Sequence, residues 1–257
     1  QDYWGGLSDL RGGLVRVLHS LSFVDDPTRI LRAVRFEQRF GFRIETRTLE
    51  LLREALSLLD RISGDRIRHE LDQVLVEPNV AQILARLAEL GVLPAIHADL
   101  GWDAWLEERL HRLLSLDTGA LLPDLQQAFN SLERKKLVYL LWMLRLPLGR
   151  AGSLMARLKF SAEMRRLVQS ACELWRELPE LAERKPSAIT GRLDDVPLPA
   201  LVGLYLASDT PQVQDMLITY LAHWRTVMPR TDGHALRARG LAPGPLYKDI
   251  LRELRDA

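Results

Sequence analysis

The sequence predicts an all-α protein with a single short strand near its N-terminus. Apolar residues recur at helical spacing through most of the 257 residues, and only Leu14 to Leu18 alternates with a charged residue as a half-buried strand does. Residues that favour helix starts and helix ends stand at the borders of the periodic stretches. The starts are Asp26-Pro27, Ser63 and Thr210-Pro211, and the ends are Gly41, Gly91 and Gly240.

The first long helix is expected to begin at Asp26-Pro27 and to run to about Phe40. Aspartate is a favoured N-cap residue, proline has its φ preset for the first helical position, and Gly41 can end the helix. Spacing of three residues keeps side chains on one side of a helix. The polar residues at this spacing are Asp26, Arg29, Arg32 and Arg35. They predict one carboxylate followed by a ladder of guanidinium groups.

The rest of the chain predicts further helices and one looser region. We expect helices over 46–59, 78–90, 102–116, 132–146, 161–176 and 210–228, one that opens at Ser63, one that ends at Gly240 and a last one that begins at Pro245. Four prolines between 179 and 199 indicate a less regular segment. The apolar run 137–144 predicts a helix at the centre of a core. The basic residues 134–136 oppose the dipole of that helix, so either an RNA backbone or an acidic surface would have to favour them.

The residues of the ladder fit two interpretations. In the first, Asp26 caps the helix and the arginines form a solvated face, as runs of charge usually do. In the second, the ladder is a nucleotide site. Asp26 accepts a hydrogen bond from the exocyclic amine of cytosine or adenine, Arg29 donates to a ring acceptor, and Arg32 and Arg35 meet phosphates.

Composition narrows the function classes only a little. The net charge of +1 carries no information about nucleic acid, so any basic footprint must be local. One cysteine excludes an internal disulfide and a multi-cysteine metal site. No apolar run approaches the ~20 residues that span a bilayer, and no signal peptide is visible. We therefore expect a cytoplasmic protein with no membrane partner. The chain begins with glutamine, and its first residues are typical of the middle of a domain, so we expect a fragment.

Residues 13–45 carry a family resemblance. Gly13-Leu14-Val15-Arg16-Val17-Leu18-His19, Ser22-Phe23, the acidic helix start and Phe40-Gly41-Phe42-Arg43-Ile44-Glu45 follow in order. Together they resemble the neck of class II tRNA nucleotidyltransferases and bacterial poly(A) polymerases. In that family an acidic pair, two spacer residues and an arginine select the incoming base. The first acidic position is often glutamate there and is Asp25 here. The resemblance implies that Asp26, Arg29, Arg32 and Arg35 bind the nucleotide.

Two further segments extend the resemblance. Residues 63–71 match a Ser-Gly-acid-Arg-Ile-x-x-Glu-Leu segment that supports the neck, which implies supporting roles for Asp25, Ser63, Arg66 and Glu70. Residues 240–245 resemble the Gly-Leu-x-Pro-Gly-Pro motif of the tail. With the helix N-terminus that follows, this turn implies RNA binding by Arg237, Arg239 and Gly244. Alone, the turn would be a plain corner between helices.

The resemblance implies a division into four parts in an elongated arrangement. Residues 1–22 are the remnant of a nucleotidyltransferase head, in which the Asp2-Tyr3-Trp4-Gly5-Gly6 loop precedes the last strand. Residues 23–77 are the neck that recognises the base. Residues 78–185 form the helical body, and residues 186–257 form the tail that binds tRNA.

The family transfers a nucleotide from CTP or ATP to the 3′ hydroxyl of tRNA. Two Mg²⁺ ions on head carboxylates stabilise the attacking and leaving oxygens. This chain shows no Asp-x-Asp followed by a strand, so we expect no catalytic or metal-binding residue in it and no activity alone. The resemblance does not separate CCA addition from CC addition, A addition or poly(A) synthesis. The alternative of a different class is a non-catalytic helical RNA-binding or scaffold module.

Overall fold

The computed structural model describes residues 5–116, 133–229, 231–242 and 244–256. The expectations at Asp2-Tyr3-Trp4, Leu132 and Pro243 lie outside these residues. The described chain forms two compact units, which consist of residues 5–116 with 133–169 and of the described residues from 170 onward. The division lies within one helix, between Gln169 and Ser170. The four-part division at residues 22, 77 and 185 stays a prediction.

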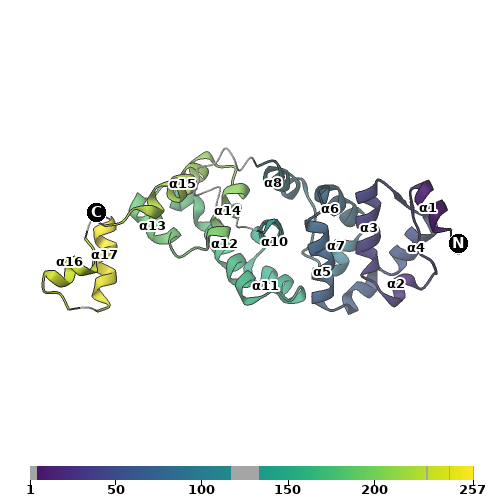
Figure 1. The fold of residues 1–257 in the computed structure, drawn as a ribbon, viewed down its shortest axis with the longest axis horizontal. Helices are drawn as coiled ribbons and strands as arrows, with labels where there is room; N and C mark the ends of the chain where they lie inside the picture. Colours follow the sequence, from purple (N-terminus) through teal and green to yellow (C-terminus); the bar gives the residue numbers. More distant parts are fainter. Residues whose placement is uncertain (1–4, 117–132, 230, 243, 257) are drawn as a thin grey trace. The chain divides into compact units, whose positions relative to one another are not determined.

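The first unit is almost entirely helical (Figure 1). Its elements are α1 (Gly6–Gly12), β1 (Leu14–Val15), α2 (Ser22–Asp25), α3 (Arg29–Phe40), β2 (Arg43–Ile44), α4 (Thr46–Glu54), the 3₁₀ helix η1 (Leu56–Arg61), α5 (Gly64–Leu75), α6 (Val80–Glu89), α7 (Val92–Ile96), α8 (Ala104–Ser115), α10 (Arg134–Leu144), α11 (Leu148–Arg157) and the start of α12 (Ala162–Leu181). The predicted all-α class is confirmed.

The second unit continues from α12. It contains α13 (Pro186–Leu193), α14 (Leu198–Ala207), α15 (Pro211–Ala222), the 3₁₀ helix η3 (Trp224–Thr226), α16 (Gly233–Ala238) and α17 (Leu246–Asp256). None of the helices in the described part of the chain is long and apolar enough to cross a membrane.

The predicted strand is present but is shorter than expected, and it has a partner. β1 spans two residues rather than Leu14 to Leu18 and pairs in parallel with β2, so that Leu14 lies beside Arg43 and Val15 beside Ile44. The amides of Arg43 and Glu45 donate to the carbonyls of Gly13 and Val15. The two strands can pair here because Gly41, with φ of 63°, ends α3 and returns the chain to β1.

α10 lies in the core of the first unit. Residues 137–144 are buried without interruption, which confirms the position predicted from the apolar run. A helix that is buried on all sides carries no amphipathic stripe, because no face of it meets water.

The prediction of a less regular segment between residues 179 and 199 is wrong. α12 continues through Pro179 to Leu181, and α13 and α14 occupy most of the segment. Pro186 and Pro199 lie in the first turns of these helices. A proline there costs no hydrogen bond, because the first amides of a helix have no partner within it. These prolines therefore start helices.

The predicted helix over 46–59 is also shorter than expected. α4 ends at Glu54 and the chain continues as η1, with Ala55 between them. The Glu45 carboxylate caps α4 by accepting from the amides of Arg47 and Thr48 at 3.0 and 2.8 Å. Likewise α15 ends at Ala222 rather than near residue 228, and η3 follows it.

Candidate functional site

Asp26 lies between α2 and α3 and does not cap α3 as predicted. The helix begins at Arg29, and Asp26 has extended backbone with φ of −147°. Its Oδ1 accepts from the Thr28 amide at 3.1 Å, from the Thr28 hydroxyl at 2.7 Å and from the Arg66 guanidinium at 2.8 Å. Asp26 therefore forms a turn that precedes the helix, and Pro27 and Thr28 complete this turn. The predicted C-terminal end at Phe40 is confirmed.

The Asp26 carboxylate is held in its charged form. Burial acts to raise its pKa, but the hydrogen bonds from the Thr28 side chain and amide and the charges of Arg66 and Arg29 outweigh burial. The pKa of Asp26 therefore lies below its ordinary value. At neutral pH the group accepts hydrogen bonds and donates none.

The arginines of the ladder divide into exposed and buried members. Arg29 is exposed, and its Nη1 donates to the carbonyl of Ser22 at 3.2 Å. The guanidinium of Arg32 is exposed and has no hydrogen bond or ion pair within the described residues. Arg35 has a side chain only 12% exposed, and it donates to Gln73 Oε1 at 3.3 Å and lies 4.0 Å from Glu77. The structure thus places Asp26, Arg29 and Arg66 together and turns Arg35 toward the following helix.

α3 and α5 run side by side in the same direction. Contacts along these helices and their flanking residues join Asp26 with Arg66, Arg35 with Gln73, and Arg39 with Glu77, and the sequence separations are 40, 38 and 38 residues. The separation of 38 residues along the helices brings Glu70 level with Arg32. Neither of these side chains has a hydrogen bond or ion pair to the part of the chain that the structure describes.

We divide this helix pair into two ends. The open end consists of Asp26, Arg29, Arg32, Arg66 and Glu70. The closed end consists of Arg35, Arg39, Gln73 and Glu77, where the Glu77 carboxylate is 7% exposed and lies 3.2 Å from Arg39. The open end leaves charged groups available to a ligand, whereas the closed end joins the helices.

Ser63, at the start of α5, and Asp25 were also predicted as supporting residues. Ser63 occupies the N-cap position, but its hydroxyl makes no capping hydrogen bond. The next residue, Gly64, is buried, and a Cβ there would lie 1.9 Å from the carbonyl oxygen of Arg157. Glycine is required by this close approach of backbone. Asp25 is half exposed and lies 3.9 Å from His19.

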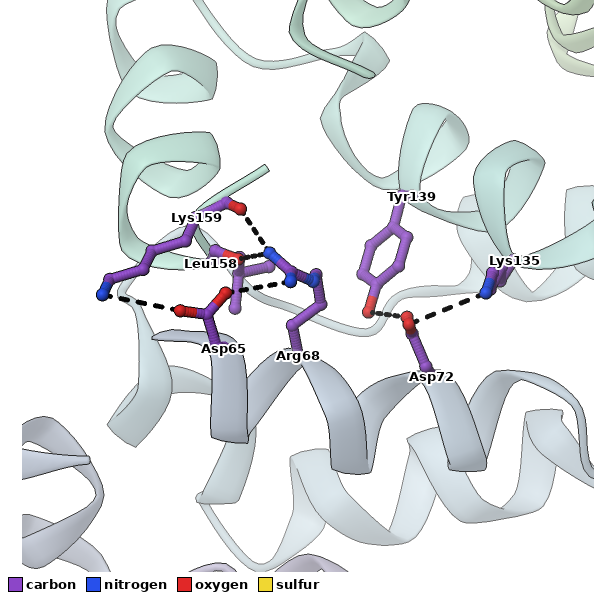
Figure 2. Close-up of polar contacts among 7 residues, drawn as sticks. All are labelled: Asp65, Arg68, Asp72, Lys135, Tyr139, Leu158 and Lys159. Atoms are coloured by element: carbon purple, nitrogen blue, oxygen red, sulfur yellow. Dashed lines mark hydrogen bonds and ion pairs between the residues drawn. The ribbon is translucent and has the colours of Figure 1, made fainter. Parts of the chain in front are cut away.

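The opposite face of α5 carries a polar network (Figure 2). Arg68 donates to the carbonyls of Leu158 and Lys159 and, at 2.9 Å, to Asp65. The Tyr139 hydroxyl donates to Asp72 at 2.9 Å. Burial, together with the Asp72 charge, raises the pKa of Tyr139 well above its ordinary value, so it stays a neutral donor. α5 is thus fixed to α10 and to the end of α11 while its other face holds Arg66 against Asp26.

The basic residues at the start of α10 have partners. Arg134 donates to the carbonyls of Leu75 and Glu77 at 3.1 Å each, at the C-terminal end of α5. Lys135 lies 3.1 Å from Glu133 and 3.8 Å from Asp72. Lys136 lies 3.2 Å from both Glu133 and Glu163. Of the two explanations for this cluster, the acidic surface is the one that the structure supports.

His97, Ser153 and Asp99 form an arrangement that resembles a catalytic triad but differs in its hydrogen bonds. His97 Nε2 lies 3.0 Å from Ser153 Oγ, and His97 Nδ1 accepts from the backbone amide of Asp99 at 3.2 Å. Because Nδ1 is the acceptor, the proton of the neutral ring lies on Nε2. The ring then donates to the serine and cannot take its proton.

The tail residues lie in exposed positions. Arg237 and Arg239 flank the end of α16, and Asp232 caps the start of that helix by accepting from the Ala235 amide at 2.8 Å. Gly240, with φ of 86°, ends this segment as predicted. Gly244 is exposed before α17, and the Tyr247 hydroxyl donates to the Leu241 carbonyl at 2.6 Å. RNA binding by these residues stays a prediction.

The donor set of the described residues does not fit a resident metal ion. No three His, Cys, Asp or Glu side chains come together in the described ranges in a way that could hold one. Near Asp26 the adjacent charged groups are guanidiniums, which repel a cation.

Exposed guanidinium groups suit the recognition of phosphates, and a charged carboxylate accepts hydrogen bonds from amine donors. Residues 41–100 match the family model described as "Probable RNA and SrmB- binding site of polymerase A". The A-adding tRNA nucleotidyltransferases of Geobacter sulfurreducens and Halalkalibacterium halodurans are each 30% identical over 97% of this chain. The chain spans 29% and 56%, respectively, of their lengths.

Solved structures of CCA-adding enzymes have a similar fold. A CCA-adding enzyme in complex with ATP is similar over 99% of this chain and 60% of its own, with a TM-score of 0.78 and 28% identity. The Thermotoga maritima CCA-adding enzyme in complex with tRNA is similar over 99% of this chain and 62% of its own, with a TM-score of 0.76 and 28% identity. The chain belongs to the tRNA nucleotidyltransferase family, as the resemblance at residues 13–45 predicted.

Proposed function

We propose that this chain is the base-selecting and tRNA-binding portion of an enzyme that adds C, A or both to the 3′ end of tRNA from CTP and ATP. The observation that carries the proposal is the open end of the α3–α5 pair, where a charged carboxylate and exposed guanidiniums lie together. The relatives are A-adding nucleotidyltransferases, and similar structures are CCA-adding enzymes with ATP, with CTP and with tRNA.

Base choice follows from hydrogen-bond polarity. Cytosine and adenine present an amine donor beside a ring acceptor, whereas uracil and guanine present a carbonyl where that amine would be. The Asp26 carboxylate attracts the amine and repels the carbonyl. Arg29 supplies the donor for the ring acceptor once its guanidinium leaves the Ser22 carbonyl.

In the proposed site Arg66 is a positioning residue. It holds Asp26 Oδ1, and Thr28 holds the same oxygen from the backbone and the hydroxyl. Oδ2 then remains as the acceptor for the base. Arg32, exposed one turn along α3, is placed to meet the phosphates. The contacts of Arg35 with Gln73 and Glu77 fix the helix pair, so we assign the main phosphate contact to Arg32.

The substitution Asp26→Asn tests the proposal. An amide can rotate and offer a donor to a carbonyl, so discrimination against UTP and GTP is expected to fall by ~1–3 kcal/mol. Relative kcat/KM for the four nucleotides is the measurement, in an active enzyme that carries this chain. Asp26→Glu keeps the charge and is the matched control. Parent-like base preference in a folded Asp26→Asn enzyme would show that Asp26 selects no base.

The chain alone is expected to be inactive. Mg²⁺ and the triphosphate need carboxylates and a glycine-rich segment that we propose lie outside these residues. Incubation with tRNA, Mg²⁺ and labelled ATP or CTP measures this directly. Robust 3′ extension by pure chain would contradict the proposed division of labour.

Poly(A) polymerase activity is the second candidate, because the family model that matches residues 41–100 is described for polymerase A. Extension assays separate the two. A tRNA nucleotidyltransferase stops after the terminal CCA, whereas a poly(A) polymerase continues to add A. A chain that binds RNA but supports neither reaction in an active context would be the non-catalytic module.

A further inference from the structure

A surface pocket of about 310 Å³ lies in the first unit, away from the open end. It is formed between the start of α8 and the end of α10. Leu106, Leu141 and Leu146 give it an apolar lining, and Trp102 and Trp142 contribute aromatic rings. The polar groups that line it are Asp99, Asp103 and Arg145.

The polar groups of the pocket are held in fixed positions. The Trp142 ring nitrogen donates to the Gly101 carbonyl at 2.6 Å, so its polar edge is satisfied within the protein. Asp103 pairs with Arg145 and accepts from the Leu106 amide. The Arg145 guanidinium also lies 4.3 Å from the centre of the Trp105 ring, which fixes its plane. These contacts give a rigid pocket.

The charges at the pocket are balanced, because each of its two carboxylates pairs with an arginine. Asp99 is 7% exposed and is paired with Arg150, whose own side chain is 61% exposed. Arg145 is 46% exposed beside Asp103. Each carboxylate is thus neutralised by an arginine that reaches solvent. Trp102 is half-buried, so its ring is accessible at the pocket.

We propose that this pocket receives an unpaired nucleobase of the RNA, stacked on Trp102, with Arg145 and Arg150 beside the adjoining phosphates. Proteins recognise unpaired RNA bases by stacking them on aromatic rings and guanidinium planes and by hydrogen bonds to their edges. The carboxylates that line the pocket favour a base that offers an amine. The inference rests on the proposed tRNA binding, and Ala98 and Asp99 of the pocket lie in the segment that matches the RNA-binding family model.

The test measures tRNA affinity of the 257-residue chain over a range of salt concentrations. Trp102→Leu removes the ring and is expected to weaken binding on the order of 10-fold. The salt dependence should stay unchanged, because stacking releases no counterions. Trp102→Phe keeps a ring and should bind within about twofold of the parent. Trp175→Leu, which removes a half-buried tryptophan on α12, is the matched control and should bind as the parent does.

Two further arms keep the test decisive. Ala98→Leu fills the exposed rim of the pocket without removing any packing, so it should weaken binding even if Trp102→Leu fails to fold. A fully paired RNA duplex offers no free base, so its affinity should be the same for the parent and for the Trp102 and Ala98 variants.

The outcomes separate this inference from the function on which it rests. Loss with Trp102→Leu and Ala98→Leu, retention with Trp102→Phe and an unchanged duplex affinity support the base pocket. Parent-like tRNA binding by both loss variants overturns it and leaves the proposed function intact. Equal losses on duplex and tRNA, or equal losses with Phe and Leu, also overturn it. Failure of the parent chain to bind tRNA overturns the proposed tRNA binding and this inference with it.

Discussion

Arg32 and Arg35 lie one turn apart on α3 and look equivalent in the sequence, yet they have different surroundings. Arg32, at the open end, is exposed and has no side-chain partner in the described ranges. Arg35, at the closed end, is largely buried against Gln73 and Glu77. The same contrast separates Glu70 from Glu77 on the other side of the pair. A regular charge pattern therefore does not indicate which of its members are free to bind a ligand.

The largest expected effect comes from Glu77→Ala at the closed end. The substitution leaves Arg35 and Arg39 without their carboxylate, and breaking a largely buried ion pair in this way costs about 3 kcal/mol of unfolding free energy. Denaturant unfolding measures it. Glu70→Ala is the matched control and should change stability by no more than about 0.5 kcal/mol. Equal losses from both substitutions would remove the distinction between the two ends.

The next effect extends the comparison to the tail, where Arg237 and Arg239 are exposed as Arg32 is. Replacing both with alanine should weaken tRNA binding about tenfold at low salt and reduce its salt dependence, because fewer counterions are released. Arg39→Ala removes an arginine that Glu77 already neutralises and should leave the salt dependence unchanged. Unchanged affinity of the double variant would make the tail turn a plain structural corner.

A smaller effect is expected from Arg32→Ala. Loss of one exposed phosphate contact should weaken CTP or ATP binding by about 1 kcal/mol, near fivefold, with no change in Tm. Arg35→Ala should do the reverse. It should lower Tm with little effect on nucleotide affinity, because its guanidinium joins the helices. Titration and thermal unfolding of both variants decide the comparison. The proposal for the open end fails if Arg32→Ala lowers Tm and leaves nucleotide affinity intact.

The smallest effect concerns pH. A carboxylate whose pKa is lowered on folding stabilises the protein above its unfolded pKa, and this stabilisation is lost as pH falls through the folded pKa. Asp26 is such a group. Asp26→Asn should therefore cost about 0.5 kcal/mol at pH 7, where the Arg66 pair is formed, and this cost should shrink as pH falls below the ordinary pKa of an aspartate. A difference that does not change with pH would mean that its origin is not the carboxylate charge.

Helix positions were predicted well because their signals are local. Ser161 accepts from the Met164 amide, Gly41 and Gly91 have positive φ, and α5, α6 and α8 lie where their apolar periods and end residues place them. The errors have identifiable causes, one of which is not local. Asp26 was predicted to cap α3, but a hydrogen bond to Thr28 and an ion pair with Arg66 compete for the same oxygen. The prolines of 179–199 were taken as breakers although first-turn positions tolerate them.

The sequence by itself determined the all-α class, most helix ends and the family, and it proposed the residues of the candidate site. Each of these depends on neighbours within a few positions or on an ordered motif. Only the tertiary structure decided which charges are free, because Arg66 reaches Asp26, and Gln73 and Glu77 reach α3, from about forty residues away. It also decided why Gly64 is glycine, since the Arg157 carbonyl that excludes a side chain there comes from a distant helix. Contacts of this kind depend on how the helices pack, and no local pattern encodes them.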